Sequence, residues 1–173
     1  MNDVVRVRIP AACEGTYPVL IGPGVISMLA ETLSLDHYSK IFIVTDETVK
    51  DLWLGSLQAV VPEASVIVVG AGEDFTSLPT LEPIWPALLN GGADRRSLVL
   101  NLGGGVVGDM GGFAAATYMR GIDFVQLPTT LLAQVDASVG GKLAVDFGGG
   151  KNLIGVFTQP KAVIADTSVL STL

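Results

Sequence analysis

The sequence is poor in the residues that build disulfides and transition-metal sites. Its 173 residues include one cysteine, Cys13, and one histidine, His37. A single cysteine cannot form a disulfide within the chain, and His37 has no nearby second ligand for a transition metal. We therefore expect Cys13 to be a packing residue and His37 a loop residue, and the sequence predicts no metal ligands.

Positive charge and long apolar runs are also scarce. Ten Lys and Arg residues stand against seventeen Asp and Glu, for a net charge of −7, and only Arg95 and Arg96 are adjacent. This pattern excludes a basic stripe that could follow a nucleic-acid backbone. No stretch reaches the ~20 apolar residues that span a bilayer, and the first residues lack a secretory signal pattern. We expect a cytoplasmic protein without nucleic-acid or membrane partners.

Apolar residues are abundant, at 49% of the chain, and they fall into short runs separated by helical patterns. Strands are predicted over 4–9, 17–21, 40–45, 65–69, 97–102, 123–127 and 162–165, and helices near 25–33, 48–60, 109–119 and 129–137. The first two strands suit a hairpin-like entry. The alternation predicts an α/β fold over residues 1–173: a doubly wound, mostly parallel Rossmann-like sheet with helices on both faces. The apolar excess is explained by buried parallel strands and by a docking surface.

Two segments fit this rhythm less simply. Residues 80–90 have helical apolar spacing, but Pro83 and Pro86 lie inside it and predict a kink or a late helix start. The glycine-rich residues 140–155 are expected to form an exposed, mobile loop.

A glycine-rich motif, GGGVVGD, follows the apolar run 97–102 and occupies residues 103–109. Glycines here permit positive φ and let backbone N–H groups approach a phosphate at the positive end of a helix. The spacing Gly103-x-Gly105-x-x-Gly108 matches a dinucleotide fingerprint, although a glycine-rich turn that only lets a helix pack on a strand has the same appearance. The acid expected ~20 residues later is Asp123, which lies at the wrong end of its strand, so Asp46 is the candidate for a ribose contact.

The segment 118–142, YMRGIDFVQLPTTLLAQVDASVGGK, and the following GKNLIG at 150–155 resemble 3-dehydroquinate synthase when taken with GGGVVGD. The resemblance implies a lyase of the shikimate pathway that feeds chorismate and aromatic amino acid biosynthesis. It implies conversion of 3-deoxy-arabino-heptulosonate 7-phosphate to 3-dehydroquinate and phosphate by transient oxidation, phosphate elimination, reduction and aldol closure. The implied cofactors are NAD and a divalent metal, Zn or Co, and the implied complete enzyme is a homodimer.

The resemblance also assigns roles to individual residues. Substrate contacts fall on Arg120, Asp136, Lys142 and Asn152, with Arg120 serving the neighbouring subunit and Lys142 also near the nicotinamide. The cofactor residues that it implies are Asp46, Glu73, Gly104, Gly105, Val106, Val107, Gly108, Asp109, Thr129, Thr130, Lys142, Lys151 and Thr172. Simpler roles stay open, because Thr129 and Thr130 also suit a helix cap, Asp136 a turn cap, and a lone lysine a solvated position.

The chain departs from the family pattern in ways that limit these assignments. Thr76 stands where the family usually has a lysine, which removes a cation from the ribose or pyrophosphate edge of the cofactor, and residues 143–149 differ where related sugar phosphate cyclases also diverge. The family's metal ligands lie in a helical carboxyl-terminal domain that this chain does not contain. We therefore expect the amino-terminal dinucleotide-binding domain of a longer enzyme, inactive by itself. The alternatives are another sugar phosphate cyclase, an iron- or zinc-type alcohol dehydrogenase, and a nucleotide-binding module without chemistry.

Overall fold

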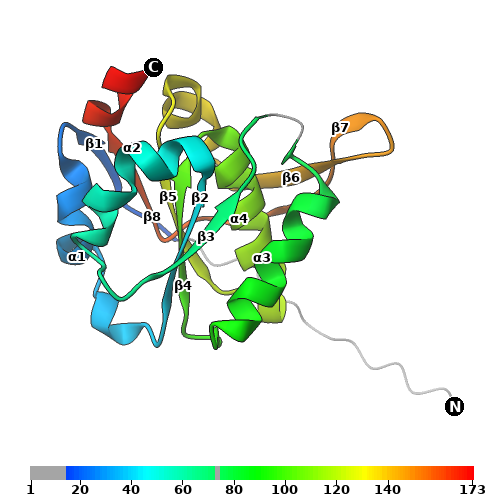
Figure 1. Cartoon of the computed structure of the whole chain (residues 1–173), viewed down its shortest axis with the longest axis horizontal. Coiled ribbons are helices and arrows are strands. Elements are labelled where there is room, and N and C mark those ends of the chain that lie inside the picture. The colour runs from blue at the N-terminus through cyan, green and yellow to red at the C-terminus, as the bar shows by residue number, and fades with distance from the viewer. Residues whose placement is uncertain (1–14, 73–74) are drawn as a thin grey trace, which may run out of the picture.

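A parallel β-sheet forms the centre of the molecule (Figure 1). The structure is a computed structural model that describes residues 15–72 and 75–173. Six parallel strands lie in the order β1-β8-β5-β4-β2-β3. Their bounds are β1 (Val19–Gly22), β2 (Ile41–Asp46), β3 (Ser65–Val69), β4 (Leu98–Gly103), β5 (Asp123–Pro128) and β8 (Ala162–Asp166). The predicted doubly wound α/β architecture is confirmed.

Helices cover both faces of this sheet, so its central strands are apolar on both sides. The long helices are α2 (Glu47–Gln58), α3 (Leu78–Asn90) and α4 (Gly105–Thr117). Short helical segments are η1 (Val25–Met28), α1 (Leu29–Thr32), η2 (Leu35–His37), η4 (Tyr118–Arg120), η5 (Ala133–Ala137) and η6 (Thr167–Thr172). In β2, Phe42 and Val44 join the core beneath α3 and α4, whereas Ile43 joins the core beneath α1 and α2. Two separate apolar cores therefore hold the sheet from opposite sides.

The strand order reverses between β2 and β4. From β2 the chain passes to the edge strand β3 and then returns to β4 on the other side of β2. The carboxyl ends of β2 and β4 are neighbours, because Thr45 pairs with Leu102 immediately before Asp46 and Gly103. Ligands of open α/β sheets bind at such a reversal, outside the carboxyl ends of the strands.

Three predicted helices differ from those observed. The helix expected near 25–33 is divided into η1 and α1, and the one expected over 129–137 contains the five-residue π-helix η5. The expected late start of the helix over residues 80–90 is wrong, because α3 begins at Leu78 and runs to Asn90 across both prolines, and the alternative of a kink stays a prediction. Pro83 and Pro86 are exposed, so water can satisfy the carbonyl groups that lose their helical partners.

Residues 140–155 are a second correction. They do not form an open loop but belong to an antiparallel hairpin of β6 (Lys142–Phe147) and β7 (Gly150–Phe157). Leu143 and Val145 are buried in the core beneath α4. A β-carbon at Gly112 of α4 would lie 2.5 Å from Leu143 Cδ2, so this glycine lets the hairpin approach the helix.

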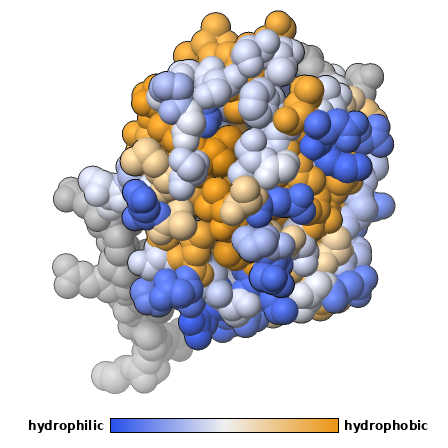
Figure 2. Space-filling view, turned by 60° about the vertical axis from the view of Figure 1, so that its left-hand side comes forward, coloured by the Kyte–Doolittle hydropathy of each residue, from blue (hydrophilic) through white to orange (hydrophobic). Residues whose placement is uncertain are grey.

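Some sequence predictions fall outside the described residues or concern the surface. The predicted strand over 4–9 and Cys13 lie outside residues 15–72 and 75–173, whereas His37 is an exposed residue that ends η2. Among the described helices, none has both the length and the apolar character needed to cross a membrane. Figure 2 brings forward the side of the molecule that carries the edge strand β1, where apolar residues gather across the middle of the face.

Candidate functional site: two joined clefts at the carboxyl edge of the sheet

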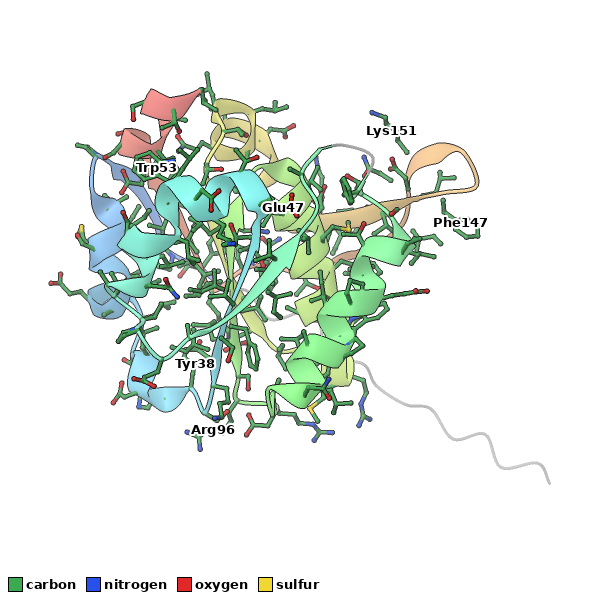
Figure 3. All side chains as sticks on the ribbon, viewed as in Figure 1. Tyr38, Glu47, Trp53, Arg96, Phe147 and Lys151 are labelled. Carbon is green, nitrogen blue, oxygen red and sulfur yellow. The ribbon has the colours of Figure 1, made fainter. Side chains whose placement is uncertain are left out.

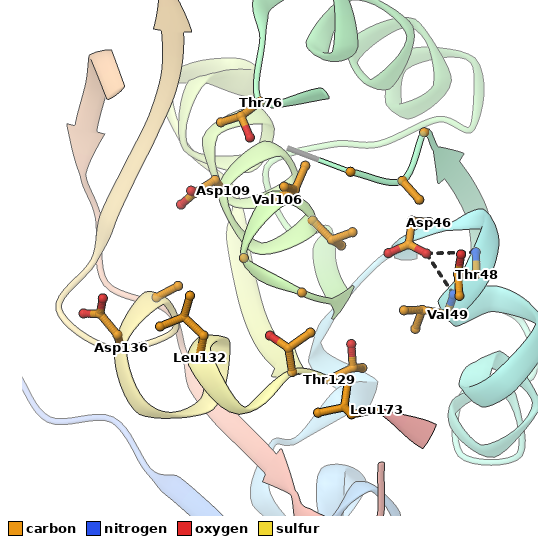
Figure 4. Close-up of a pocket in the computed structure, with 18 of the residues that line it drawn as sticks. Asp46, Thr48, Val49, Thr76, Val106, Asp109, Thr129, Leu132, Asp136 and Leu173 are labelled. Atoms are coloured by element: carbon orange, nitrogen blue, oxygen red, sulfur yellow. Dashed lines mark hydrogen bonds between the residues drawn. The ribbon is translucent and has the colours of Figure 1, made fainter. Parts of the chain in front are cut away.

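A cleft of about 570 Å³, here called the main cleft, opens where the strand order reverses (Figure 4). A second cleft of about 500 Å³, here called the hairpin cleft, lies beside β6 and β7. Asp109, Asp136, Ala137 and Asn152 line both. The two clefts are therefore neighbouring parts of one site, and these four residues mark their junction.

Most of the sequence-predicted residues meet at this site. The predicted cofactor residues that line the main cleft are Asp46, Gly104, Gly105, Val106, Val107, Asp109, Thr129, Thr130, Lys151 and Thr172. Of the predicted substrate residues, Asp136 and Asn152 line both clefts and Lys142 lines the hairpin cleft. Glu73 lies outside the described residues. The structure thus brings the two predicted groups together in adjoining clefts that share Asp109, Asp136 and Asn152.

The first turn of α4 is a ready anion site at the floor of the main cleft. Its N-cap is Gly104, which makes no capping side-chain bond, and the turn holds no acidic residue. The first N–H groups of the helix therefore point into the cleft without a protein partner, at the positive end of the helix dipole. Thr129 is buried beside them, and its Oγ1 has no hydrogen-bond partner. A phosphate would satisfy both.

Glycine is required around this turn because neighbouring side chains lie too close. A β-carbon at Gly103 would lie 2.5 Å from Val107 Cβ, and one at Gly104 would lie 3.3 Å from Thr130 Cγ2. Gly108 lines neither cleft, and its carbonyl oxygen accepts a 3.1 Å hydrogen bond from Gln126 Nε2 of β5. Gly108 fits the alternative of a glycine that packs the helix on the sheet.

Asp46 lies at the end of β2, beside the glycine turn. Its Oδ1 accepts hydrogen bonds from the backbone N–H groups of Thr48 (2.9 Å) and Val49 (2.8 Å), so the residue caps α2. Both bonds use the same oxygen, which leaves Oδ2 for a ligand hydroxyl. The predicted position of Asp46 at the site is thus accompanied by a capping role that the sequence analysis did not assign.

Asp109 occupies the junction of the two clefts, early in α4. Burial, with a further contribution from the charge of Asp146, raises the pKa of the Asp109 carboxyl from 3.8 to about 7. A neutral carboxylic acid can donate a hydrogen bond that a carboxylate cannot. Near neutral pH this one group therefore offers a donor or an acceptor at the point where the clefts meet.

The sequence analysis missed one wall of the main cleft. Trp53 Nε1 of α2 donates a 3.1 Å hydrogen bond to Thr172 Oγ1, which in turn donates to the Val169 carbonyl oxygen. The Thr172 hydroxyl is therefore held by protein groups. Trp53 could have been found from the sequence, because a residue seven positions after the N-cap Asp46 returns to the same side of the helix. The other lining residues that the sequence analysis did not name are Thr48, Val49, Leu52, Gly70, Ala71, Gly72, Leu132, Ala137, Asp146 and Leu173. Thr76, which the sequence analysis named as a departure from the family pattern, lines this cleft as well.

Arg120 does not join this site within the chain. It ends η4, which follows α4 and precedes β5, and therefore lies at the amino-terminal edge of the sheet. Arg120 is exposed and lines neither cleft. Its φ is 72° and that of Met119 is 51°, a left-handed conformation that is strained for residues with a β-carbon.

The two ends of the molecule can be followed in Figure 3. Lys151 and Trp53 lie at the end that carries the main cleft, and Arg96 lies at the opposite end.

The described residues do not offer a metal site. Within 15–72 and 75–173 there is no group of three or more His, Cys, Asp or Glu side chains that could hold a metal ion.

Comparison with known proteins identifies the family of the chain. The family model described as 3-dehydroquinate synthase N-terminal matches residues 66–173. A 3-dehydroquinate synthase of Halorhodospira halophila is 49% identical over 162 residues, which cover 92% of this chain and 45% of that protein. The chain thus spans about half the length of the curated relatives that it matches.

Two solved structures with similar folds are synthases that were determined with bound NAD+ and a metal ion. A 2-epi-5-epi-valiolone synthase from Streptomyces hygroscopicus with bound NAD+ and Zn2+ is 32% identical, with a TM-score of 0.84 over 96% of this chain and 47% of that one. A 2-deoxy-scyllo-inosose synthase complexed with carbaglucose-6-phosphate, NAD+ and Co2+ is 30% identical, with a TM-score of 0.81 over 88% of this chain and 43% of that one.

Proposed function

The chain belongs to the family of 3-dehydroquinate synthase N-terminal domains, and from this premise we propose that it is the NAD-binding part of a 3-dehydroquinate synthase. The complete enzyme would convert 3-deoxy-arabino-heptulosonate 7-phosphate to 3-dehydroquinate and phosphate, in the cytoplasm. The chain spans 45% of a relative with that name, which supports a second domain in the complete protein. We expect no turnover by the chain alone.

The observation that carries the proposal is the uncapped start of α4 beside the unpartnered Thr129 hydroxyl, at the reversal of strand order. These groups fit the pyrophosphate of a dinucleotide. Asp46 Oδ2 then suits the diol of the adenosine ribose, and the wall that contains Trp53 suits the adenine ring. The nicotinamide would lie toward Asp109, where the clefts join.

The hairpin cleft offers the groups that a phosphorylated keto-acid needs. When bound beside it, NAD supplies a reversible hydride acceptor. Lys142 Nζ can pair with an anionic group of the substrate, and the Asn152 amide can both donate to and accept from its hydroxyls. Asp136, at the junction, can accept a hydroxyl proton. The described residues do not fit a divalent metal, so we assign the Zn or Co ligands of the complete enzyme to its other domain.

A pair of matched threonine variants tests the cofactor site. Thr129 and Thr45 are both buried with unpartnered hydroxyls, but only Thr129 lines the main cleft. In calorimetric titrations with NAD, we expect Thr129→Val to weaken binding about tenfold, which corresponds to ~1.4 kcal/mol for one hydrogen bond. Thr45→Val should bind as the unmodified chain does. Equal affinity of all three proteins would contradict the proposed pyrophosphate position.

A second candidate is another sugar phosphate cyclase. The 2-deoxy-scyllo-inosose synthase, which is complexed with carbaglucose-6-phosphate, is 30% identical to this chain and has a similar fold. The full-length protein should be assayed for phosphate release from 3-deoxy-arabino-heptulosonate 7-phosphate and from glucose 6-phosphate. Release from glucose 6-phosphate alone would favour the second candidate.

We assign Arg120 to the substrate site of a neighbouring subunit in a homodimer, because it lies far from both clefts of its own chain. In the full-length protein, Arg120→Ala and Lys142→Ala should each be inactive. Mixed dimers of the two variants should regain activity, since one site of each mixed dimer then holds both native residues. Mixtures that stay inactive would contradict the shared site.

A further inference from the structure

Asp146 of β6 joins the hairpin to the segment between β3 and α3. Its backbone N–H donates a 2.9 Å hydrogen bond to the Thr76 carbonyl oxygen, and the residue forms an isolated parallel bridge with Ser77. The same segment lines the main cleft through Gly70, Gly72 and Thr76. Asp146 therefore connects the hairpin to a wall of the proposed cofactor site.

The side chain of Asp146 makes a second connection, across the hairpin. Its Oδ1 accepts a 2.7 Å hydrogen bond from the backbone N–H of Asn152. The pairing of β6 with β7 is irregular between Val145 and Phe147, so this bond lies where the regular ladder is interrupted. Asn152 has φ 53°, a left-handed conformation that is uncommon for a residue other than glycine. Asn tolerates this conformation better than most residues, and the hydrogen bond to the Asp146 carboxylate fixes Asn152 in it.

Strand β6, which carries Asp146, is packed into the core. Leu143 and Val145, on the same strand as Asp146, are buried against α4 with 2% or less of their surface exposed. The strand is fixed to the helix that begins at the glycine turn. A displacement of Thr76 and Ser77 would therefore act on the Asp146 backbone and, through the Asp146 carboxylate, on Asn152.

The charge of Asp146 also reaches the junction of the clefts. It contributes, after burial, to the raised pKa of Asp109 in α4. The other charged groups that line the two clefts near Asp109 are Asp136 of η5, Lys142 of β6 and Lys151 of β7. Asp146 is thus connected to the cofactor segment, to Asn152 and to the junction residue Asp109.

We propose that Asp146 is a positioning residue that couples Thr76 to Asn152, so that a dinucleotide in the main cleft fixes the residue that meets the substrate. The proposal rests on the proposed function, because it takes NAD as the ligand of the main cleft. A residue that only stabilised the hairpin turn would hold Asn152 equally well with and without the dinucleotide.

Hydrogen exchange and NMR of the 173-residue chain distinguish the two roles. NAD should shift the backbone amide resonances of Gly105 to Val107. It should also slow the hydrogen exchange of the Asn152 backbone amide at least tenfold. In Asp146→Ala, the shifts at the glycine turn should persist and the slowing at Asn152 should be lost. Asp146→Asn keeps an oxygen that can accept the bond and should restore the slowing. Asp36→Ala, at the exposed η2, serves as the charge-matched control.

Slowing at Asn152 that survives in Asp146→Ala would overturn the coupling. If NAD shifts no amide at the glycine turn of the unmodified chain, the proposed function fails, and the coupling fails with it. The positioning of Asn152 by Asp146 is then tested without NAD. The backbone amide of Asn152 should exchange at least tenfold faster in Asp146→Ala than in Asp146→Asn. Equal exchange rates in the two variants would overturn this positioning role. If Asp146→Ala does not fold, Asp146→Ser replaces it, because the serine side chain is too short to reach Asn152.

Discussion

Asp109 shows how burial alters the chemistry of a single residue. Its carboxyl would ionise well below neutral pH in water, but burial and the nearby Asp146 raise the pKa to about 7. The folded chain therefore holds a proton at Asp109 between about pH 4 and pH 7, where the unfolded chain has lost it. Because the folded state binds more protons in this range, the contribution of Asp109 to stability falls as the pH rises from 4 to 7 and is constant above that.

Asp109→Asn should remove this pH dependence, since an amide does not titrate. We expect the variant to gain stability relative to the unmodified chain as the pH rises from 4 to 8, by ~1.4 kcal/mol for each unit by which the pKa is raised. Urea unfolding of both proteins at a series of pH values measures the difference. A difference that is the same at pH 4 and pH 8 would contradict the raised pKa.

Asp46 combines a structural role with a proposed binding role, and two substitutions separate them. Asn caps helices about as well as Asp, so Asp46→Asn should leave the free energy of unfolding nearly unchanged but weaken NAD binding, because the charged acceptor for the ribose diol is lost. Asp46→Ala should lose ~1 kcal/mol of stability as well. Thermal unfolding and NAD titration measure the two effects. Unchanged NAD affinity in both variants would place the ribose elsewhere.

At the scale of elements, the glycines of α4 allow this helix to lie close to the sheet and to the hairpin. Its glycines face polar and apolar side chains of the sheet and the hairpin: a β-carbon at Gly111 would lie 1.9 Å from Asn101 Oδ1, and one at Gly112 would lie 2.5 Å from Leu143 Cδ2. The helix gives up helix propensity at these positions. In return its first turn lies close to the ends of β4 and β5, where the cleft opens.

Two glycine-to-alanine variants in different helices test this explanation. Gly111→Ala should destabilise the chain, because the new methyl group forces Asn101 out of its buried position, at a cost of ~1–3 kcal/mol for overpacking. Gly55→Ala in α2 should stabilise it by ~0.5–1 kcal/mol, because no atom lies within 4 Å of the added carbon. Urea unfolding measures both. A stabilised Gly111→Ala variant would show that the close approach is not needed.

At the scale of the whole molecule, the sheet and the hairpin differ in how they are buried. Every residue of β4 is buried, whereas most of β7 is exposed and the hairpin is anchored in the core mainly through Leu143 and Val145 of β6. We expect β4 amides to exchange with solvent only through global unfolding and β7 amides through a local opening of lower free energy. Native-state hydrogen exchange in increasing denaturant measures this. Equal protection of both strands would show that the hairpin unfolds with the sheet.

Apolar residues also remain on the surface beside the site and along the sheet edge. Val135 of η5 is 70% exposed and Phe157 of β7 is 84% exposed, and Ile21 of the edge strand β1 is 73% exposed. Figure 2 shows apolar residues on the side that carries β1. The two cores therefore bury only part of the apolar residues of the chain, and the docking surface expected from the composition stays a prediction.

The sequence by itself determined the strands of the sheet and the glycine turn. Apolar runs bounded by turn residues specify buried strands locally, and closely spaced glycines specify a turn that approaches a helix start, as at residues 98–105. The ordered motifs that follow gave the family, which the comparison confirms. Asp46 could be chosen because the carboxyl ends of parallel strands meet at one edge.

Only the tertiary structure decided which residues face each other across the site. Asp109 and Asp146 are far apart in the chain, and so are Thr76 and Asp146, and no local pattern encodes their proximity. The hairpin was missed because its glycines suggest a loop, whereas the burial of Leu143 and Val145 against α4 makes it a strand pair. Arg120 was placed at the opposite edge by the direction of α4. These features depend on the order in which the strands and helices are placed around the sheet. Packing between segments that are distant in the sequence fixes this order, and the local sequence does not.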